Sequence, residues 1–379
     1  MYRIPLNKPF LSGDELRYAA ESISGGQISG DGTFTRRCHQ LLEQKLGAAR
    51  VLLTTSCTHA LEMAALLLNV APGDEVILPS FTFVSTANAF VLRGARPVFV
   101  DIRPDTLNLD EGTLEQLVTL HTRAVVPVHY AGVGCEMDAI MEIAERHRIG
   151  VVEDNAHGLF ASYKGRRLGT IGCLGAQSFH ETKNIICGEG GALVINDTAF
   201  LERAEMIRQK GTNRSRFFRG QVDKYTWVDV GSSYLPSDLL AAFLCAQLEK
   251  SAEIHCIRRR IWHTYIEQLK AWAEQRGVRL PVVPEECEQS YHMFYLILPT
   301  PQLRDDFIQH LKTQGIMAAF HYVPLHLSEM GQKFGGWPGQ CPVTEYISER
   351  LVRLPFYNGL TEQEQAEVID AVKGFGGGA

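Results

Sequence analysis

Between Val51 and Ile195 the chain repeatedly changes from short runs of β-branched and apolar residues to longer stretches with apolar residues at helical spacing. The short runs are EVILPS, ARPVFVD, TRAVVPVHY, IGVVEDN and GGALVIND. This alternation predicts strands joined by helical crossovers, the kind of connection that parallel strands require. Because the runs are apolar throughout, both faces of the sheet are expected to be covered. The sequence therefore predicts an α/β fold with a mostly parallel central sheet.

The C-terminal third of the chain has a different pattern. In residues 236–276, apolar side chains recur at helical spacing and predict one long helix or two successive helices that leave the large domain. Beyond them, MFYLILP and MAAFHYVP are candidate strands around a predicted helix over residues 305–314. We therefore expect a large domain over residues 1–250 and a small α+β domain over residues 251–379.

The composition excludes several kinds of partner. The 379 residues carry a formal net charge of −6, which gives no basic field for nucleic acid. Nine cysteines without a CxxC pair predict neither a disulfide framework nor a zinc site, and they fit a reducing cytoplasm. The aspartates of DIRPDTLNLD lack the spacing of a calcium loop. With no segment of membrane length, we expect a cytoplasmic protein without nucleic-acid, membrane or metal partners.

A lone lysine, Lys183, stands between a strand-like run and a glycine-rich turn in SFHETKNIICGEGGALVIND. Most lysines are solvated surface charges, and a tight turn into the next strand explains the glycines of GEGG equally well. A chemical interpretation of Lys183 therefore depends on whether a cofactor site can be built around it.

The first supporting feature is VVEDNAHG, an apolar strand that ends in Glu153 and Asp154. Folds with parallel sheets bind ligands at the carboxyl edge of the sheet. An aspartate at that edge can pair with a protonated pyridine nitrogen and keep the ring able to accept electrons from a carbanion. The alternative is an ordinary loop contact made by a strand-end acid.

A candidate phosphate site is the second supporting feature. In LLTTSCTHALEMAALLL, the amides and hydroxyls of Ser56, Cys57 and Thr58 would lie at a helix N-terminus, where anions bind. Simple N-capping by Ser56 or Thr58 is the alternative. Ser178 could add a hydroxyl to the same phosphate. Phe83 follows another strand and could stack on a heteroaromatic ring, although core packing would also explain it.

Taken in chain order, EDxAHG, SFHETKN and GEGG resemble the motifs of the DegT/DnrJ/StrS family of sugar aminotransferases, and the likeness extends from IPLNKPF to HYVPLH. The resemblance implies the aspartate aminotransferase type I fold, pyridoxal phosphate with pyridoxamine phosphate as its intermediate form, and a homodimer with active sites at the interface. Segments such as GDGTFTRRC and GSSYL look most like the WecE-type transaminases. That likeness implies amino transfer from L-glutamate to carbon 4 of dTDP-4-keto-6-deoxy-D-glucose, giving dTDP-4-amino-4,6-dideoxy-D-galactose.

The resemblance also implies roles for individual residues. Lys183 would bind the cofactor covalently and act as catalytic base and acid, Asp154 would contact the pyridine nitrogen, and His157 would lie near the phenolic oxygen. Phe83 would stack on the ring. The phosphate would be held by the Cys57 amide, Thr58, Ser178 and, from the partner subunit, Ser233, which stands where many family members have asparagine.

The basic segment KGTNRSRFFRGQVDKYTW is a candidate for contacts with the nucleotide-sugar diphosphate, across the dimer. Arginine suits two-pronged phosphate contacts, whereas a solvated loop explains any single residue nearly as well. The candidate substrate residues are Arg214, Arg219, Lys224, Tyr225 and, from HYVPLH, His321.

Two other functions are compatible with these motifs. One is a member of the same family that acts on another nucleotide keto sugar or at carbon 3. The other is a non-catalytic regulator that binds pyridoxal phosphate, which the set of Asp154, His157, Ser178 and Lys183 disfavours. A dehydratase variant would have histidine in place of Lys183. A route to a polysaccharide or a secondary metabolite is left open.

Overall fold

The fold is built on one large mixed sheet, seen in a computed structural model that describes residues 2–376. Seven strands lie in the order β1-β9-β8-β5-β4-β2-β3. Their bounds are Arg50–Thr54 (β1), Glu75–Pro79 (β2), Arg96–Val100 (β3), Thr122–Val125 (β4), Gly150–Asp154 (β5), Leu174–Ser178 (β8) and Gly191–Ile195 (β9). Strands β3, β2, β4, β5 and β8 run parallel, whereas β9 runs antiparallel to both its neighbours, β1 and β8. The predicted α/β fold is confirmed.

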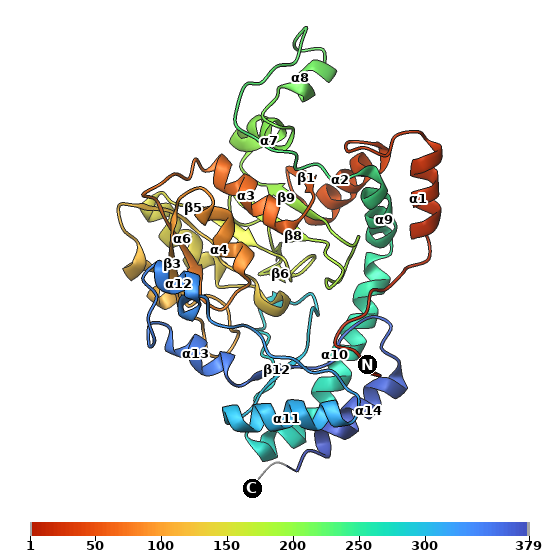
Figure 1. The fold of residues 1–379 in the computed structure, drawn as a ribbon, viewed down its shortest axis with the longest axis vertical. Helices are drawn as coiled ribbons and strands as arrows, with labels where there is room; N and C mark the ends of the chain where they lie inside the picture. The colour runs from red at the N-terminus through yellow and green to blue at the C-terminus, as the bar shows by residue number, and fades with distance from the viewer. Residues whose placement is uncertain (1, 377–379) are drawn as a thin grey trace.

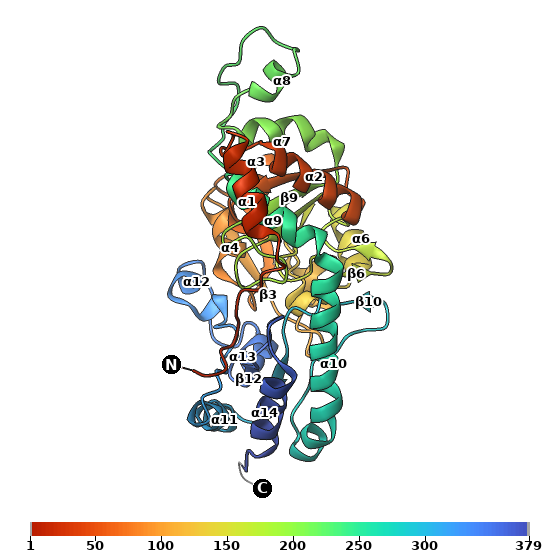
Figure 2. The same ribbon diagram turned by 90° about the vertical axis from the view of Figure 1, so that its right-hand side faces the viewer.

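Helices cover both faces of this sheet, as the apolar runs predicted. Along each strand, alternate side chains point to opposite faces, so that Leu52 joins one core cluster while Val51 and Leu53 join another. On the first face lie α3 (Cys57–Leu67), α4 (Val84–Val91) and α7 (Leu201–Arg208). On the second lie α2 (Thr33–Leu46), α6 (Met137–His147) and α9 (Asp238–Glu249). Figures 1 and 2 show α4 and α6 on opposite sides of the sheet.

The C-terminal part forms a separate hydrophobic cluster. The predicted helical segment is two helices, because α9 ends at Glu249 and α10 (Ser251–Arg276) begins after Lys250. Helix α10 packs with α11 (Pro301–Thr313), α14 (Glu362–Lys373) and the pair β11 (Tyr295–Ile297) and β12 (Leu351–Arg353) (Figure 1). The boundary at residue 250 remains a prediction, and Ile4 packs into this C-terminal cluster, where it bridges Ile316.

One predicted strand of the C-terminal part is wrong. The run MFYLILP contains β11, but MAAFHYVP, residues 317–324, forms only a single bridge, between Ala319 and Arg353. The physical reason is that this stretch turns its side chains toward a cavity instead of extending the pairing with β12. Phe320, His321 and Tyr322 all line that cavity.

The remaining elements are short or peripheral. They are α1 (Glu15–Ser24), α5 (Glu111–Leu114), α8 (Arg214–Phe218), α12 (Glu329–Lys333), α13 (Pro342–Ser348) and a small sheet of β6 (Ser162–Tyr163), β7 (Arg166–Arg167) and β10 (Cys287–Glu288). Helix α8 belongs to an arm that projects beyond the rest of the molecule (Figures 1 and 2). None of the helices in residues 2–376 combines the length and apolar content needed to span a bilayer.

The carboxylate of Glu153 holds the loop between β7 and β8 against the end of β5. Its two oxygens accept hydrogen bonds from the backbone N–H groups of Gly169 (2.7 Å), Ile171 (2.6 Å) and Gly172 (2.7 Å). The fourth partner is the Nε2 atom of His129, at 2.9 Å, and both side chains are fully buried. Of the two strand-end acids, Glu153 is therefore structural, and it fixes the end of β5 that carries Asp154.

Replacing Glu153 with glutamine is expected to lower the free energy of unfolding by about 2–3 kcal/mol, because an amide NH₂ would face backbone donors that now have an acceptor. Guanidinium denaturation followed by circular dichroism measures this change. The matched control is Glu285→Gln at an exposed position. Equal stability of the two variants would contradict the structural role of Glu153.

Candidate active site

A cavity of about 760 Å³ opens at the carboxyl ends of the parallel strands. Its wall combines the ends of β5 and β8, the starts of α3 and α4, and two stretches of the C-terminal part, 319–322 and 353–354. Ligand sites are expected at this edge because the strand ends leave side chains and backbone groups free there. The structure brings together nine predicted residues in the lining: Ser56, Cys57, Thr58, Phe83, Asp154, His157, Ser178, Lys183 and His321.

Lys183 lies in the loop that joins the antiparallel strands β8 and β9. The base of this loop is closed by hydrogen bonds from Phe179 N–H to the Gly190 carbonyl and from Cys187 N–H to the Phe179 carbonyl, both 2.8 Å long. Within GEGG, the chain bends at Gly188, whose φ of 84° favours glycine, so this glycine also has a structural role. A Cβ on Gly191 would lie 2.3 Å from the backbone of Ser56, so that only glycine lets β9 start beside α3.

The amine of Lys183 makes no hydrogen bond or ion pair within residues 2–376. Burial lowers the pKa of Lys183 below its ordinary value, and nearby Cys57 and Asp154 oppose that change. A larger fraction of this lysine is therefore neutral at neutral pH than of a surface lysine, which suits it to covalent chemistry and proton transfer.

Asp154 is held in one orientation at the end of β5. One carboxylate oxygen accepts a hydrogen bond from Thr86 Oγ1 at 2.7 Å, and the other accepts from Ala156 N–H at 3.1 Å. The residue is only 5% exposed, and no cationic side chain of residues 2–376 forms an ion pair with it. A buried carboxylate in this setting could receive a positively charged ring nitrogen.

The start of α3 offers free donors to an anion. Ser56 is the N-cap and accepts a hydrogen bond from His59 N–H at 3.1 Å, so the capping interpretation holds for its hydroxyl. Thr58 Oγ1 donates to Ser85 Oγ at 2.8 Å. The backbone N–H groups of Cys57 and Thr58 have no acceptor within the described residues. These two groups and the buried Ser178 hydroxyl could hold a phosphate.

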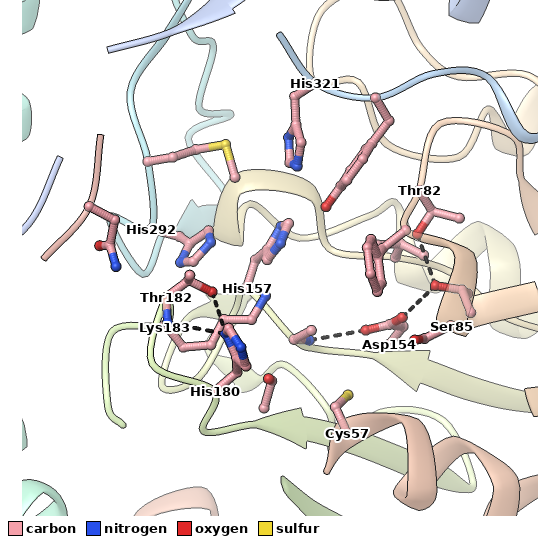
Figure 3. A pocket seen from close by; sticks show the side chains of 18 of the residues that line it. Cys57, Thr82, Ser85, Asp154, His157, His180, Thr182, Lys183, His292 and His321 are labelled. Atoms are coloured by element: carbon pink, nitrogen blue, oxygen red, sulfur yellow. Dashed lines mark hydrogen bonds between the residues drawn. The ribbon is translucent and has the colours of Figure 1, made fainter. Parts of the chain in front are cut away.

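Three histidines face the cavity above Lys183 (Figure 3). His157 stacks on His292 with ring centroids 4.2 Å apart, and His292 Nδ1 lies 2.9 Å from the side-chain oxygen of Asn184. His321 Nδ1 lies 3.0 Å from the Tyr130 hydroxyl. Burial is the main cause that holds the pKa of each histidine well below its ordinary value, and the charge of Lys183 acts in the same direction. The three rings are therefore neutral near pH 7.

These lowered pKa values predict that stability is lost in acid. In the unfolded chain each histidine takes up a proton near pH 6.5, whereas in the folded protein it stays neutral to a lower pH. Below pH 6.5 the unfolded chain therefore binds more protons than the folded protein, and acid lowers the free energy of unfolding. The free energy of unfolding should fall by up to about 1.4 kcal/mol per pH unit for each histidine as the pH drops from 6.5 toward 5.

Melting temperatures between pH 7.5 and 5 test this expectation. His157→Gln should have a shallower dependence on pH than the native protein, whereas the control His121→Gln, at an exposed position, should not. The same slope in the native protein and in His157→Gln would contradict the prediction for that histidine.

Several residues of the cavity were not predicted from the sequence. Thr86, which fixes Asp154, lies one helical turn beyond Phe83, and His292 and Arg353 come from the C-terminal part. The Nε atom of Arg353 is buried and has no hydrogen-bond partner within residues 2–376. A lone histidine or arginine in a short strand carries no motif, and only the fold brings these residues to Lys183.

Five predicted residues do not line the cavity. Ser233 is exposed and its backbone bridges Gln209. The other four lie on the projecting arm: Arg214, Arg219, Lys224 and Tyr225. Arg219 pairs with Glu205 at 2.7 Å, and the Arg214 guanidinium lies over the Phe218 ring at 5.1 Å. Within one chain, these side chains are therefore separate from Lys183.

The fold and the site define the class of the protein. A mixed α/β sheet with an unpaired lysine, a fixed aspartate and an open helix N-terminus at one edge is the arrangement of an aminotransferase. The chain belongs to the DegT/DnrJ/EryC1/StrS aminotransferase family, which matches residues 10–373. The prediction of an enzyme of this family is confirmed.

Two relatives cover almost the whole chain. The uncharacterized protein MJ1066 of Methanocaldococcus jannaschii is 33% identical over 98% of this chain and 97% of its own length. The spore coat polysaccharide biosynthesis protein SpsC of Bacillus subtilis is 32% identical over 98% of this chain and 96% of its own.

Solved structures of similar proteins share the entire fold. The aminotransferase TlmJ of Streptoalloteichus hindustanus is 30% identical over 98% of each chain, with a TM-score of 0.90. DesV of S. venezuelae, solved with a ketimine intermediate, is 31% identical over 98% of each chain, with a TM-score of 0.88. Spr1654 of Streptococcus pneumoniae, in its PMP form, is 26% identical over 98% of each chain, with a TM-score of 0.91. Spr1654 has also been solved in a PLP form, so the predicted cofactor, pyridoxal phosphate, is supported.

Proposed function

We propose that this chain transfers an amino group from L-glutamate to carbon 4 of dTDP-4-keto-6-deoxy-D-glucose, with pyridoxal phosphate as cofactor, in the cytoplasm. The observation that carries the proposal is the unpaired amine of Lys183 in one cavity with the fixed carboxylate of Asp154. The nine cysteines are all free thiols, as a reducing compartment would keep them.

The residues of the cavity fit this cofactor. Lys183 is assigned the covalent bond to it and Asp154 the pyridine nitrogen, while Phe83, 58% exposed at the cavity, would stack on the ring. The buried Nδ1 atom of His157 lacks a hydrogen-bond partner within residues 2–376, and we assign to it the phenolic oxygen. The phosphate is assigned to the backbone N–H groups at the start of α3 and to the hydroxyl of Ser178. When bound, pyridoxal phosphate supplies an electron-accepting ring that stabilises a carbanion beside the amino nitrogen.

Lys183 moves the proton of the reaction. Because burial lowers its pKa, its amine can take the proton from the α-carbon of the donor and would deliver it to the carbon on the other side of the amino nitrogen, which the cofactor contributes. The same residue acts in the reverse direction on the sugar. Asn184, the next residue, donates to the Ser290 carbonyl at 2.7 Å and contacts His292, so the loop that carries Lys183 is held against the C-terminal part.

Arg353 is assigned to the carboxylate of the amino donor. Its guanidinium lines the cavity, its Nε atom is buried without a partner, and no carboxylate of residues 2–376 pairs with it. A half-buried guanidinium with an unpartnered buried Nε atom is stabilised by an anionic ligand, and a carboxylate matches its geometry. Because the histidines beside Arg353 are neutral, we assign the carboxylate of glutamate to the positive charge of Arg353.

The nucleotide part of the sugar substrate is assigned to the projecting arm of a second subunit. The arm exposes Phe218, Tyr225 and Trp227 together with Arg214 and Lys224, an unusual amount of apolar and basic surface for a solvated loop. In a homodimer, this arm and Ser233 would reach the neighbouring active site, where arginine and lysine would meet the diphosphate.

The relatives support a sugar substrate. SpsC is named for polysaccharide biosynthesis, and Spr1654 is described as a candidate sugar aminotransferase. The choice of carbon 4 and of the dTDP sugar follows from the WecE-like segments of the sequence. A different keto sugar, or carbon 3, is the competing proposal within the family.

Absorbance spectroscopy tests the proposed function. The purified protein with pyridoxal phosphate is recorded alone, then with L-glutamate, then with dTDP-4-keto-6-deoxy-D-glucose. We expect the spectrum to change to that of pyridoxamine phosphate with glutamate and to return with the sugar. Return only with another keto sugar would overturn the substrate, and no change with any amino acid would identify a non-catalytic binding protein.

A further inference from the structure

A second cavity, of about 780 Å³, shares a wall with the active site. The shared wall is the segment Gln289–Met293. His292 and Met293 line the active-site cavity, whereas Gln289 and Tyr291 line the second one. The rest of the second cavity is formed by helix α10, the end of α2, β7, β10 and the loop residues Phe160 and Val283, and Figure 2 shows α10 and β10 side by side.

The second cavity has an excess of positive charge. Lys45 and Arg259 line it, and neither pairs with a carboxylate of residues 2–376. Arg167 also lines it and lies 4.0 Å from Glu288, which is the only acid among the described lining residues. Burial, then Arg259 and Arg167, lower the pKa of His255 beside them. This charge arrangement favours an anionic ligand.

Aromatic rings form the other part of the wall. The Tyr291 ring lies 5.9 Å from Trp262 and 5.1 Å from His255. Tyr291 has a φ of 55°, which a bulky residue adopts only when its surroundings enforce it. This backbone conformation directs Tyr291 to the second cavity and the next residue, His292, to the active site.

We infer that the second cavity binds a mononucleotide, separately from the amino-transfer site. Unpaired lysine and arginine side chains provide for its phosphate, and the half-buried ring of Tyr291, with the edge of Trp262 beside it, provides for its planar base. The volume is within the range of small-molecule sites. A simple anion would contact only the basic side chains of the wall, and an uncharged ring would contact only its aromatic side chains, whereas a mononucleotide can contact both.

Adenosine 5′-monophosphate is the probe for this site. Calorimetric titration of the full-length protein loaded with pyridoxal phosphate should detect binding that is about tenfold weaker, or worse, in Arg259→Ala and in Lys45→Ala. The matched control is Arg260→Ala, because Arg260 is the next residue on α10, pairs with Glu362 at 3.4 Å and does not line the cavity. Because Arg259 and Lys45 lie on different helices, a folding defect in one variant would not affect the result from the other.

Four outcomes would overturn the inference. They are no binding at millimolar concentration, equal binding by Arg259→Ala and Arg260→Ala, inorganic phosphate or adenosine binding as tightly as the nucleotide, and loss of binding in His321→Ala, which would place the nucleotide in the active site. Quenching of tryptophan fluorescence that disappears in Trp262→Phe would support the assigned cavity. Because no step uses the amino-transfer reaction, failure here leaves the proposed function unaffected.

Discussion

Lys183→Ala is expected to slow amino transfer by at least about 10³-fold while the protein stays folded, because the variant loses both the covalent anchor of the cofactor and the group that moves the proton. The side chain makes no hydrogen bond or ion pair within residues 2–376, so its removal costs the fold little. Stopped-flow absorbance of the half-reaction with glutamate measures the rate, and thermal melting checks the fold.

Two further variants make the Lys183 result specific. Lys183→Arg keeps a positive charge but not a titratable amine, so it should be nearly as slow as the alanine variant. Lys312→Ala, on the exposed surface of α11, should retain the native rate. A Lys183→Arg variant with most of the native rate would contradict the role of proton carrier.

Asp154→Asn is expected to lower kcat by about 10²-fold to 10³-fold, because a neutral amide no longer favours the protonated pyridine nitrogen. The asparagine oxygen can still accept from Ala156 N–H, and its NH₂ group can donate to Thr86 Oγ1, which donates to Asp154 in the native protein, so the loss is mainly electrostatic. Steady-state kinetics with glutamate measure kcat and KM, and the absorbance of the dialysed protein measures cofactor retention.

The KM for glutamate should change less than kcat in Asp154→Asn, since the donor carboxylate is assigned to Arg353. Asp370→Asn on the exposed surface of α14 is the matched control. A native kcat in Asp154→Asn would contradict the contact that we assign between Asp154 and the pyridine nitrogen.

Much of this site could be predicted from the sequence because parallel strands align their carboxyl ends. The apolar run that forms β5 ends in Asp154, the strand-like run before Lys183 forms β8 and ends in Ser178, and the sheet places both residues at one edge. Lys183 follows directly in the next loop. These predictions needed only the strand boundaries and the direction of the strands.

The direction of β9 could not be read from its composition, because GGALVIND resembles the parallel runs. The loop between Ser178 and Gly191 folds back through hydrogen bonds of Phe179 with Gly190 and Cys187 instead of forming a crossover helix, and β9 therefore returns antiparallel to β8. The same limit applies to residues 317–324, whose apolar pattern resembles a strand although they line the cavity. For residues 317–324, the deciding contacts join distant parts of the chain.

The residues that the C-terminal part contributes to the site could not be predicted from the sequence, for a related reason. Arg353 and His292 approach Lys183 only after two hydrophobic clusters have formed and docked. No local pattern marks them, whereas Thr86 lies within a segment already recognised at a strand end. Local spacing identifies strand ends, and tertiary packing selects which distant side chains complete the site.

The bridge between Ile4 and Ile316 has a consequence for the order of folding. Ile4 is fully buried, yet the residues that bury it belong to the C-terminal hydrophobic cluster, far along the chain. Contacts between positions so distant in sequence require a large loop to close, and they form later than local contacts. We therefore expect the segment around Ile4 to dock only after the C-terminal core has formed, with an apolar side chain exposed until then.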